Sequence, residues 1–114
     1  DAKELIIRFS RDAACNKEVF LGLSSLVYKF PEVFLNEALG TLARNVESNR
    51  RVMDSNAAFY CETFIHKYLL NSHGPLPRVM HRNLIIILDA LVERGSAKAY
   101  FLREHLVRSR KIEN

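Results

Sequence analysis

The sequence predicts an all-α domain, and three observations lead to this fold class. Apolar residues recur with the 3.6-residue period of an amphipathic helix along nearly the whole chain. Only 4 of the 114 residues are glycine and 3 are proline, too few for the many tight turns of an all-β fold. Apolar residues make up 48% and charged residues 26%, which is typical of a globular domain and excludes a mainly disordered chain. We therefore expect one helical domain, with about six helices, over residues 1–114.

Two amphipathic helices are expected before the first proline. One spans 3–14, and Asn16 is a suitable N-cap for the next, over 17–29. Pro31 ends the second helix, because the residue before a proline is disfavoured in the α conformation. The apolar stripes of these helices are Leu5, Ile6, Phe9 and Ala13, then Phe20, Leu23, Leu26, Val27 and Phe30.

The next two helices are expected at 31–46 and 50–72, with a polar loop at 47–49 between them. Gly40 costs the first helix roughly 1 kcal/mol relative to alanine; it either permits a close helix crossing or is merely tolerated. The polar triplet at 54–56 leaves open a break of the second helix, with a main part from residue 57. The apolar stripes are Leu35, Ala38, Leu39, Leu42 and Val46, then Ala57, Tyr60, Cys61, Phe64, Tyr68 and Leu69.

Glycine and two prolines make 71–77 the strongest break in the chain, and we expect an ordered loop there. A fifth helix is expected at 78–94. Its apolar run Leu84–Leu88 alone would also suit a buried strand, but the pattern continues to Val92, which is too long for a typical strand. The sequence therefore predicts a central helix that is apolar on most sides.

The last helix is expected at 97–110, and no sheet is expected. Gly95 suits the position after a helix end, and Ser96 suits the N-cap of the following helix. The polar tail 108–114 is expected to fray. The apolar residues expected to pack this helix are Tyr100, Phe101, Leu102, Leu106 and Val107.

Six helices with short loops would pair as three antiparallel hairpins: 3–14 with 17–29, 31–46 with 50–72, and 78–94 with 97–110. This arrangement, a right-handed solenoid or a compact helical bundle, resembles a fragment of an armadillo/HEAT-type α-solenoid. The resemblance is architectural, without a 40-residue period. It implies a scaffold for protein–protein contacts and assigns no individual binding residue. The segments that carry it are Phe20–Phe30 with Pro31–Leu42, and Asn83–Val92 with Ser96–Val107.

The cysteines and the chain start bear on the compartment. Cys15 and Cys61 are too few for a disulfide framework, and both lie among apolar residues of predicted helices, so we expect buried thiols. No N-x-S/T sequon is present, which favours an intracellular protein, cytoplasmic or nuclear. The longest apolar run has five residues, whereas a membrane span needs about 20, so no membrane partner is expected. The start at Asp1, without methionine, favours a segment of a longer protein.

Catalytic and metal-binding patterns are missing, so neither an enzyme nor a cofactor is expected of this segment. The sequence has no G-x-S-x-G, P-loop or G-x-G-x-x-G motif. Cys61 and His66 are five residues apart, about 140° around a helix, which is poor zinc-site geometry. His73 and His81 flank the glycine–proline loop but lack further ligands. Each carboxylate has a basic neighbour, such as Asp89 with Arg94 and Glu4 with Arg8.

Positive charge is concentrated in the second half of the chain. The net charge is +4; residues 1–57 hold 8 acids and 8 bases, while 58–114 hold 5 acids and 9 bases. These bases are candidates for partner contacts, although a solvated helix face would carry similar charges. The candidates are Arg78, Arg82, Arg94, Lys98, Arg103, Arg108, Arg110 and Lys111.

Two functions fit this surface. The favoured interpretation is a non-catalytic protein–protein interaction module that binds another protein or peptide. The alternative is a helical nucleic-acid-binding domain, but Asp89, Glu93 and Glu104 interrupt its basic stripe. A secreted helical cytokine with a Cys15–Cys61 bridge is the least favoured. Candidate aromatic anchors are Tyr28, Tyr60, Tyr68 and Tyr100.

Overall fold

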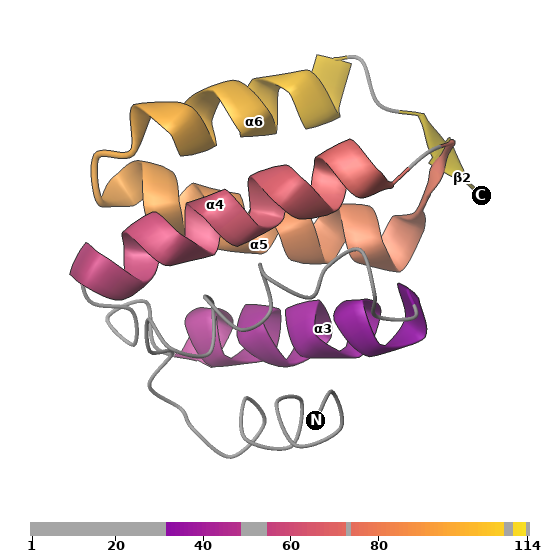
Figure 1. Cartoon of the computed structure of the whole chain (residues 1–114), viewed down its shortest axis with the longest axis horizontal. Coiled ribbons are helices and arrows are strands. Elements are labelled where there is room, and N and C mark those ends of the chain that lie inside the picture. Colours follow the sequence, from indigo (N-terminus) through magenta and orange to yellow (C-terminus); the bar gives the residue numbers. More distant parts are fainter. Residues whose placement is uncertain (1–31, 49–54, 73, 109–110, 114) are drawn as a thin grey trace.

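The computed structural model describes residues 32–48, 55–72, 74–108 and 111–113. Most of these residues are helical, which confirms the predicted fold class for this part of the chain. Figure 1 shows successive helices running in opposite directions. The helices expected at 3–14 and 17–29 lie outside the described residues. The described helices are α3 (Glu32–Ser48), α4 (Ser55–Asn71), α5 (Arg78–Glu93) and α6 (Ala97–Arg108).

Helix α5 is the centre of the packing. It packs closely against both α3 and α6, and α4 also contacts it. The run Leu84–Leu88 lies within α5, so the predicted central helix is confirmed; Ile85 and Ile86 are only half-buried. The buried side chains of α5 are Met80, Leu84, Ile87, Leu88, Ala90 and Leu91.

The packing of α3 differs from the expected hairpin of 31–46 with 50–72. Helix α3 packs most closely on α5, and the two run in the same direction in Figure 1. Gly40 faces α5 here, but the approach does not require glycine, because a Cβ atom on Gly40 would lie 3.6 Å from Asn83 Nδ2, an ordinary contact. Helix α4 reaches α3 through a long side chain, since the Tyr68 hydroxyl donates a hydrogen bond to Asn36 Oδ1 at 2.9 Å.

The turn between α5 and α6 forms as the sequence predicts. Gly95 has φ +91°, a left-handed conformation that favours glycine. Its N–H donates to the Val92 carbonyl at 2.9 Å, and the Ser96 N–H donates to the Leu91 carbonyl at 3.1 Å. These two bonds are those of a Schellman motif, which satisfies the last carbonyls of α5. The Ser96 Oγ then accepts the Ala99 N–H at 3.0 Å, so Ser96 caps α6.

Two short segments pair at the opposite end, where no sheet was expected. Strand β1 (Leu76–Pro77) pairs in parallel with β2 (Ile112–Glu113), and the Leu76 N–H donates to the Lys111 carbonyl at 3.0 Å. The expectation that the tail 108–114 frays is therefore wrong for 111–113. The pairing forms because Leu76 is buried in the core, which holds β1 beside the returning chain.

The packing face of α6 is narrower than the sequence suggested. Ala99 and Leu106 are buried, whereas Phe101 is 69% exposed and Val107 63% exposed. Tyr100 is exposed as well, so three of the five expected packing residues of α6 are wrong. Helix α6 is an outer helix that is covered on one side, and the small Ala99 lets that side approach the core. Among the described residues, no helix is long and apolar enough to cross a bilayer.

Candidate partner-binding surface

The start of α5 and the end of α6 meet at one end of the α5–α6 hairpin, beside the strand pair (Figure 1). Leu76 pairs with Ile112, and His81 Nε2 lies within hydrogen-bonding distance, 3.4 Å, of the Leu106 carbonyl oxygen. These contacts place two pairs of predicted bases at the same end of the hairpin, although the pairs are more than twenty residues apart in sequence. We call this surface the basic end; its cations are Arg78, Arg82, Arg108 and Lys111, all exposed.

Exposed aliphatic side chains stand next to three of these cations in the sequence. Val79 is 68% exposed and Ile112 is 40% exposed, and Val107 is exposed on α6 next to Arg108. Single exposed apolar residues are common on protein surfaces. Here three branched side chains fall within the same two short segments as the four cations. The basic end therefore offers both charge and apolar contact area.

The cations of this region differ in what they already bind. Arg108 forms an i,i+4 ion pair with Glu104 at 3.0 Å, and its position in the last turn of α6 suits the helix dipole. The Arg108 side chain is nevertheless 78% exposed, so the pair contributes little to stability and leaves the guanidinium accessible.

Arg103 has a structural role in the middle of the hairpin. Its Nη1 lies 2.7 Å from Asp89 Oδ1, and its guanidinium stands 5.5 Å from the centre of the Tyr100 ring. The hydrogen bond to Asp89 raises the pKa of Arg103 above its ordinary value. Asp89 therefore pairs with Arg103 of α6. The sequence had suggested its neighbour Arg94 as the partner instead. Five residues along a helix place Arg94 about 140° away from Asp89.

The remaining candidate bases do not join the basic end. Arg94 follows the end of α5 and Lys98 lies in the first turn of α6, so both stand at the opposite end of the hairpin. Arg110 lies outside the described residues. The structure therefore divides the predicted basic stripe into two separate groups, with the Asp89–Arg103 pair between them.

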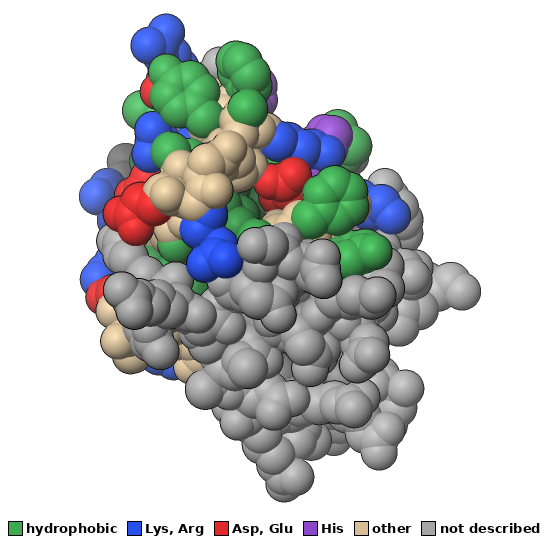
Figure 2. Space-filling view, turned by 90° about the vertical axis from the view of Figure 1, so that its left-hand side faces the viewer, with side chains coloured by type: hydrophobic (Ala, Val, Ile, Leu, Met, Phe, Trp, Pro, Cys, Tyr) green, Lys and Arg blue, Asp and Glu red, His purple; other side chains and the backbone are tan. Residues whose placement is uncertain are grey.

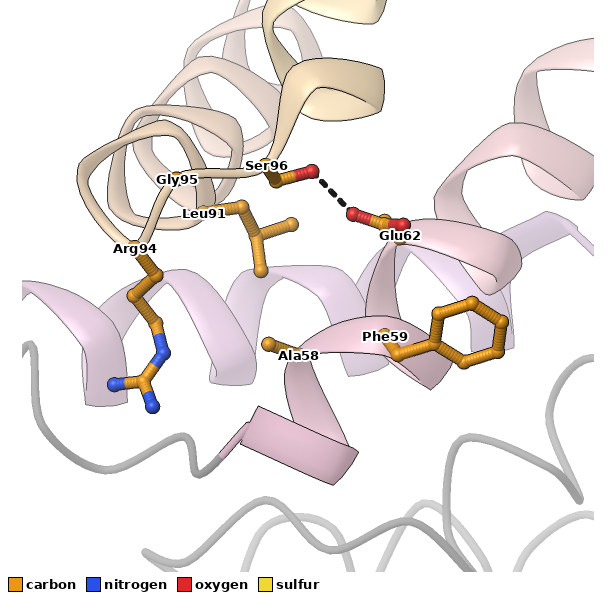
Figure 3. Close-up of a pocket in the computed structure, with 7 residues that line it drawn as sticks. All are labelled: Ala58, Phe59, Glu62, Leu91, Arg94, Gly95 and Ser96. Carbon is orange, nitrogen blue, oxygen red and sulfur yellow. Dashed lines mark hydrogen bonds between the residues drawn. The ribbon is translucent and has the colours of Figure 1, made fainter.

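The opposite end of the hairpin, which we call the turn end, carries a depression of about 470 Å3. Figure 3 shows Arg94 and Phe59 on opposite sides of it, with Ala58 and Leu91 between them. Figure 2 shows that apolar, acidic and basic side chains are intermixed over the described part of this face. The residues that line the depression are Ala58, Phe59, Glu62, Leu91, Arg94, Gly95 and Ser96.

Two polar side chains of this depression, Ser96 and Glu62, are held by internal hydrogen bonds. The Ser96 hydroxyl donates to Glu62 Oε2, a bond drawn in Figure 3, while the same oxygen caps α6. Glu62 thereby ties α4 to the turn. The Gly95 and Ser96 N–H groups donate to α5 carbonyls, so this turn offers no anion site.

The histidines and cysteines show no metal-binding arrangement in the described part of the chain. No group of three or more His, Cys, Asp or Glu side chains is placed to hold a metal ion there. His66 is half-buried on α4, His105 is exposed on α6, and His73 lies outside the described residues. Cys61 is a buried thiol on α4, as predicted, and Cys15 lies outside the described residues.

The candidate tyrosine anchors fall into different environments. Tyr68 is a core residue bonded to α3, and Tyr60 is half-buried with its ring edge-on to Phe59. Tyr100 is exposed and packs edge-on against Phe101. Tyr28 lies outside the described residues. Sequence reasoning did not identify Phe59, Phe101 and Val107 as surface residues. For α6 a signal was available, because this helix has more apolar residues than one buried stripe can hold.

The chain was compared with known proteins in three ways. No protein-family model, no curated protein and no solved structure matches it.

Proposed function

We propose that this chain is a non-catalytic helical module that binds another protein. The observation that carries the proposal is the set of large apolar side chains left on the surface, above all on α6. Phe101 is 69% exposed next to exposed Tyr100 on the same helix. Aromatic side chains of this kind are the usual anchors of protein interfaces. The described exposed large apolar residues are Phe59, Leu70, Val79, Tyr100, Phe101, Val107 and Ile112.

We further propose that the helices belong to a solenoid of the armadillo/HEAT type, within a longer intracellular protein. In support, α3 and α5 run in the same direction and pack together, as corresponding helices of stacked pairs would. The loose contact between α3 and α4 departs from a regular helix pair. A crystal structure with the flanking sequence would test this: further stacked pairs support it, and a closed bundle contradicts it.

A photo-cross-linking experiment tests the interaction function. A benzophenone amino acid replaces Phe101 in one copy of chain 1–114, and exposed Glu47 of α3 in a control copy. In an extract of the source cells, position 101 should give a discrete adduct that protease removes, nuclease leaves intact and excess unlabelled chain competes away. Equal labelling from both positions, or a nuclease-sensitive adduct, would contradict the proposal.

Nucleic-acid binding is the second candidate function, favoured by one observation: the hairpin gathers Arg78, Arg82, Arg108 and Lys111 at one end. Binding through phosphates weakens steeply as salt rises. We expect only weak binding of duplex or single-stranded DNA, lost by physiological salt. Sub-micromolar affinity at about 150 mM salt would make this the better function.

A further inference from the structure

The basic end combines exposed cations with exposed aliphatic side chains. Four exposed cations lie there, against two acidic residues: Glu104, which pairs with Arg108, and Glu113 of β2. The exposed side chains Val79, Val107 and Ile112 lie in the same two segments, where burial against a partner would stabilise a complex.

We propose that the basic end binds an acidic peptide segment of a partner protein, one that also presents aliphatic side chains. This proposal rests on the protein-interaction function above and adds to it a second contact surface, separate from the exposed aromatic side chains of α6, with a partner of stated chemistry. Carboxylates of the peptide would pair with Arg82, Arg108 and Lys111, where arginine can form two parallel hydrogen bonds to one carboxylate. Aliphatic side chains of the peptide would cover Val79 and Val107.

The apolar part of this surface distinguishes a peptide from a nucleic acid. Nucleic-acid backbones present phosphates and sugars, and single-stranded bases are held by stacking on aromatic rings. Residues 76–82 and 106–112 contain no Phe, Tyr or Trp, and their exposed apolar side chains are aliphatic. The exposed aromatic pair Tyr100 and Phe101 belongs to the other half of α6. The charge and the aliphatic side chains together therefore complement an acidic, partly apolar peptide.

Fluorescence anisotropy with the full chain tests this proposal. The probe is a fluorescein-labelled 16-residue peptide of glutamate and leucine, compared with a peptide in which serine replaces each leucine. The test variant is the double change Arg82→Glu and Arg108→Glu. The matched control is Arg94→Glu with Lys98→Glu, which alters the net charge equally at the turn end. Circular dichroism melts establish that each variant is folded.

The test variant should bind the glutamate–leucine peptide at least roughly tenfold more weakly, and the control should stay within about twofold of the parent chain. Val79→Ser should also weaken binding, and the serine peptide should bind less tightly than the leucine peptide. If the test variant is unfolded, the double change Arg82→Gln and Lys111→Gln replaces it. This variant should also bind the glutamate–leucine peptide more weakly than the parent chain.

Three results would overturn the proposal. Equal losses in the test and control variants would mean that net charge alone attracts the peptide. If a 20-nucleotide oligothymidylate binds more tightly than the glutamate–leucine peptide, and Val79→Ser does not change its affinity, the basic end is a nucleic-acid site. Failure of the peptide to bind, while cross-linking at position 101 still traps a protein, would reject this site and leave the interaction function standing.

Discussion

The two ends of the α5–α6 hairpin carry similar residues and use them differently. At the turn end, Ser96 and Glu62 bond to each other, and the Gly95 N–H is taken up by α5. At the basic end, Arg82 and Lys111 are exposed beside exposed aliphatic side chains. Polar groups held by internal bonds stabilise the fold, and we propose that the accessible charge beside aliphatic side chains at the basic end serves recognition. The difference cannot be read from residue type, because both ends contain arginine, lysine and apolar residues.

The largest expected effect concerns the helix that joins the two ends. Leu88 is fully buried in α5, so Leu88→Ala leaves a cavity and should cost roughly 2–5 kcal/mol of unfolding free energy. Urea melts followed by circular dichroism measure this loss. A loss below about 1 kcal/mol would mean that α5 is not the centre of the core.

A pair of glycine substitutions sharpens the view that the turn end is structural. Gly95→Ala should cost about 1–2 kcal/mol, because φ +91° disfavours a Cβ atom although nothing lies within 4 Å of it. Gly40→Ala is the control: its Cβ would meet Asn83 at an ordinary 3.6 Å, so helix propensity should raise stability by up to about 1 kcal/mol. In thermal melts, Gly95→Ala should lower the stability and Gly40→Ala should raise it. A loss of stability in both variants would mean that α3 and α5 are in tighter contact at Gly40.

Sequence reasoning located the four described helices well because their signals are local. The fifth helix was expected at 78–94 and spans Arg78–Glu93, since Gly95 and Ser96 provide the stop and start signals within the chain itself. Long-range features were missed. The pairing of Leu76 with Ile112 and the ion pair of Asp89 with Arg103 depend on how α6 folds back on α5.

The candidate surface was predictable in its residues but not in its arrangement. Every base of the basic end was named from the sequence. The sequence alone, however, does not distinguish these bases from Arg94 and Lys98. Only the antiparallel path of α5 and α6 separates the two groups. The exposure of Phe101 and Val107 was missed for a related reason, since period alone does not say which side of an apolar helix is covered.

A smaller effect is expected from the cap that joins α4 to the turn. Ser96→Ala removes the acceptor for the Ala99 N–H and the donor to Glu62, and should cost about 1 kcal/mol. Glu62→Ala removes only the tie to α4 and should cost less than Ser96→Ala. Urea melts that rank the two variants the other way would show that the tie, not the cap, dominates this end.

The smallest effect on stability is expected at the basic end. Arg82 is exposed, so Arg82→Glu should change the unfolding free energy by less than about 0.5 kcal/mol. The same substitution should reduce affinity for the glutamate–leucine peptide, because it reverses a charge on the proposed contact surface. A stability loss as large as that of Gly95→Ala would give Arg82 a structural role and remove the contrast between the two ends.

The most direct test of this contrast is an NMR titration of the isotope-labelled chain with the glutamate–leucine peptide. The account predicts chemical-shift changes concentrated in residues 76–82 and 106–112, with residues 58–62 and 94–96 nearly unchanged. Shifts concentrated instead around Phe59 and the Gly95 turn, with the basic end silent, would contradict it.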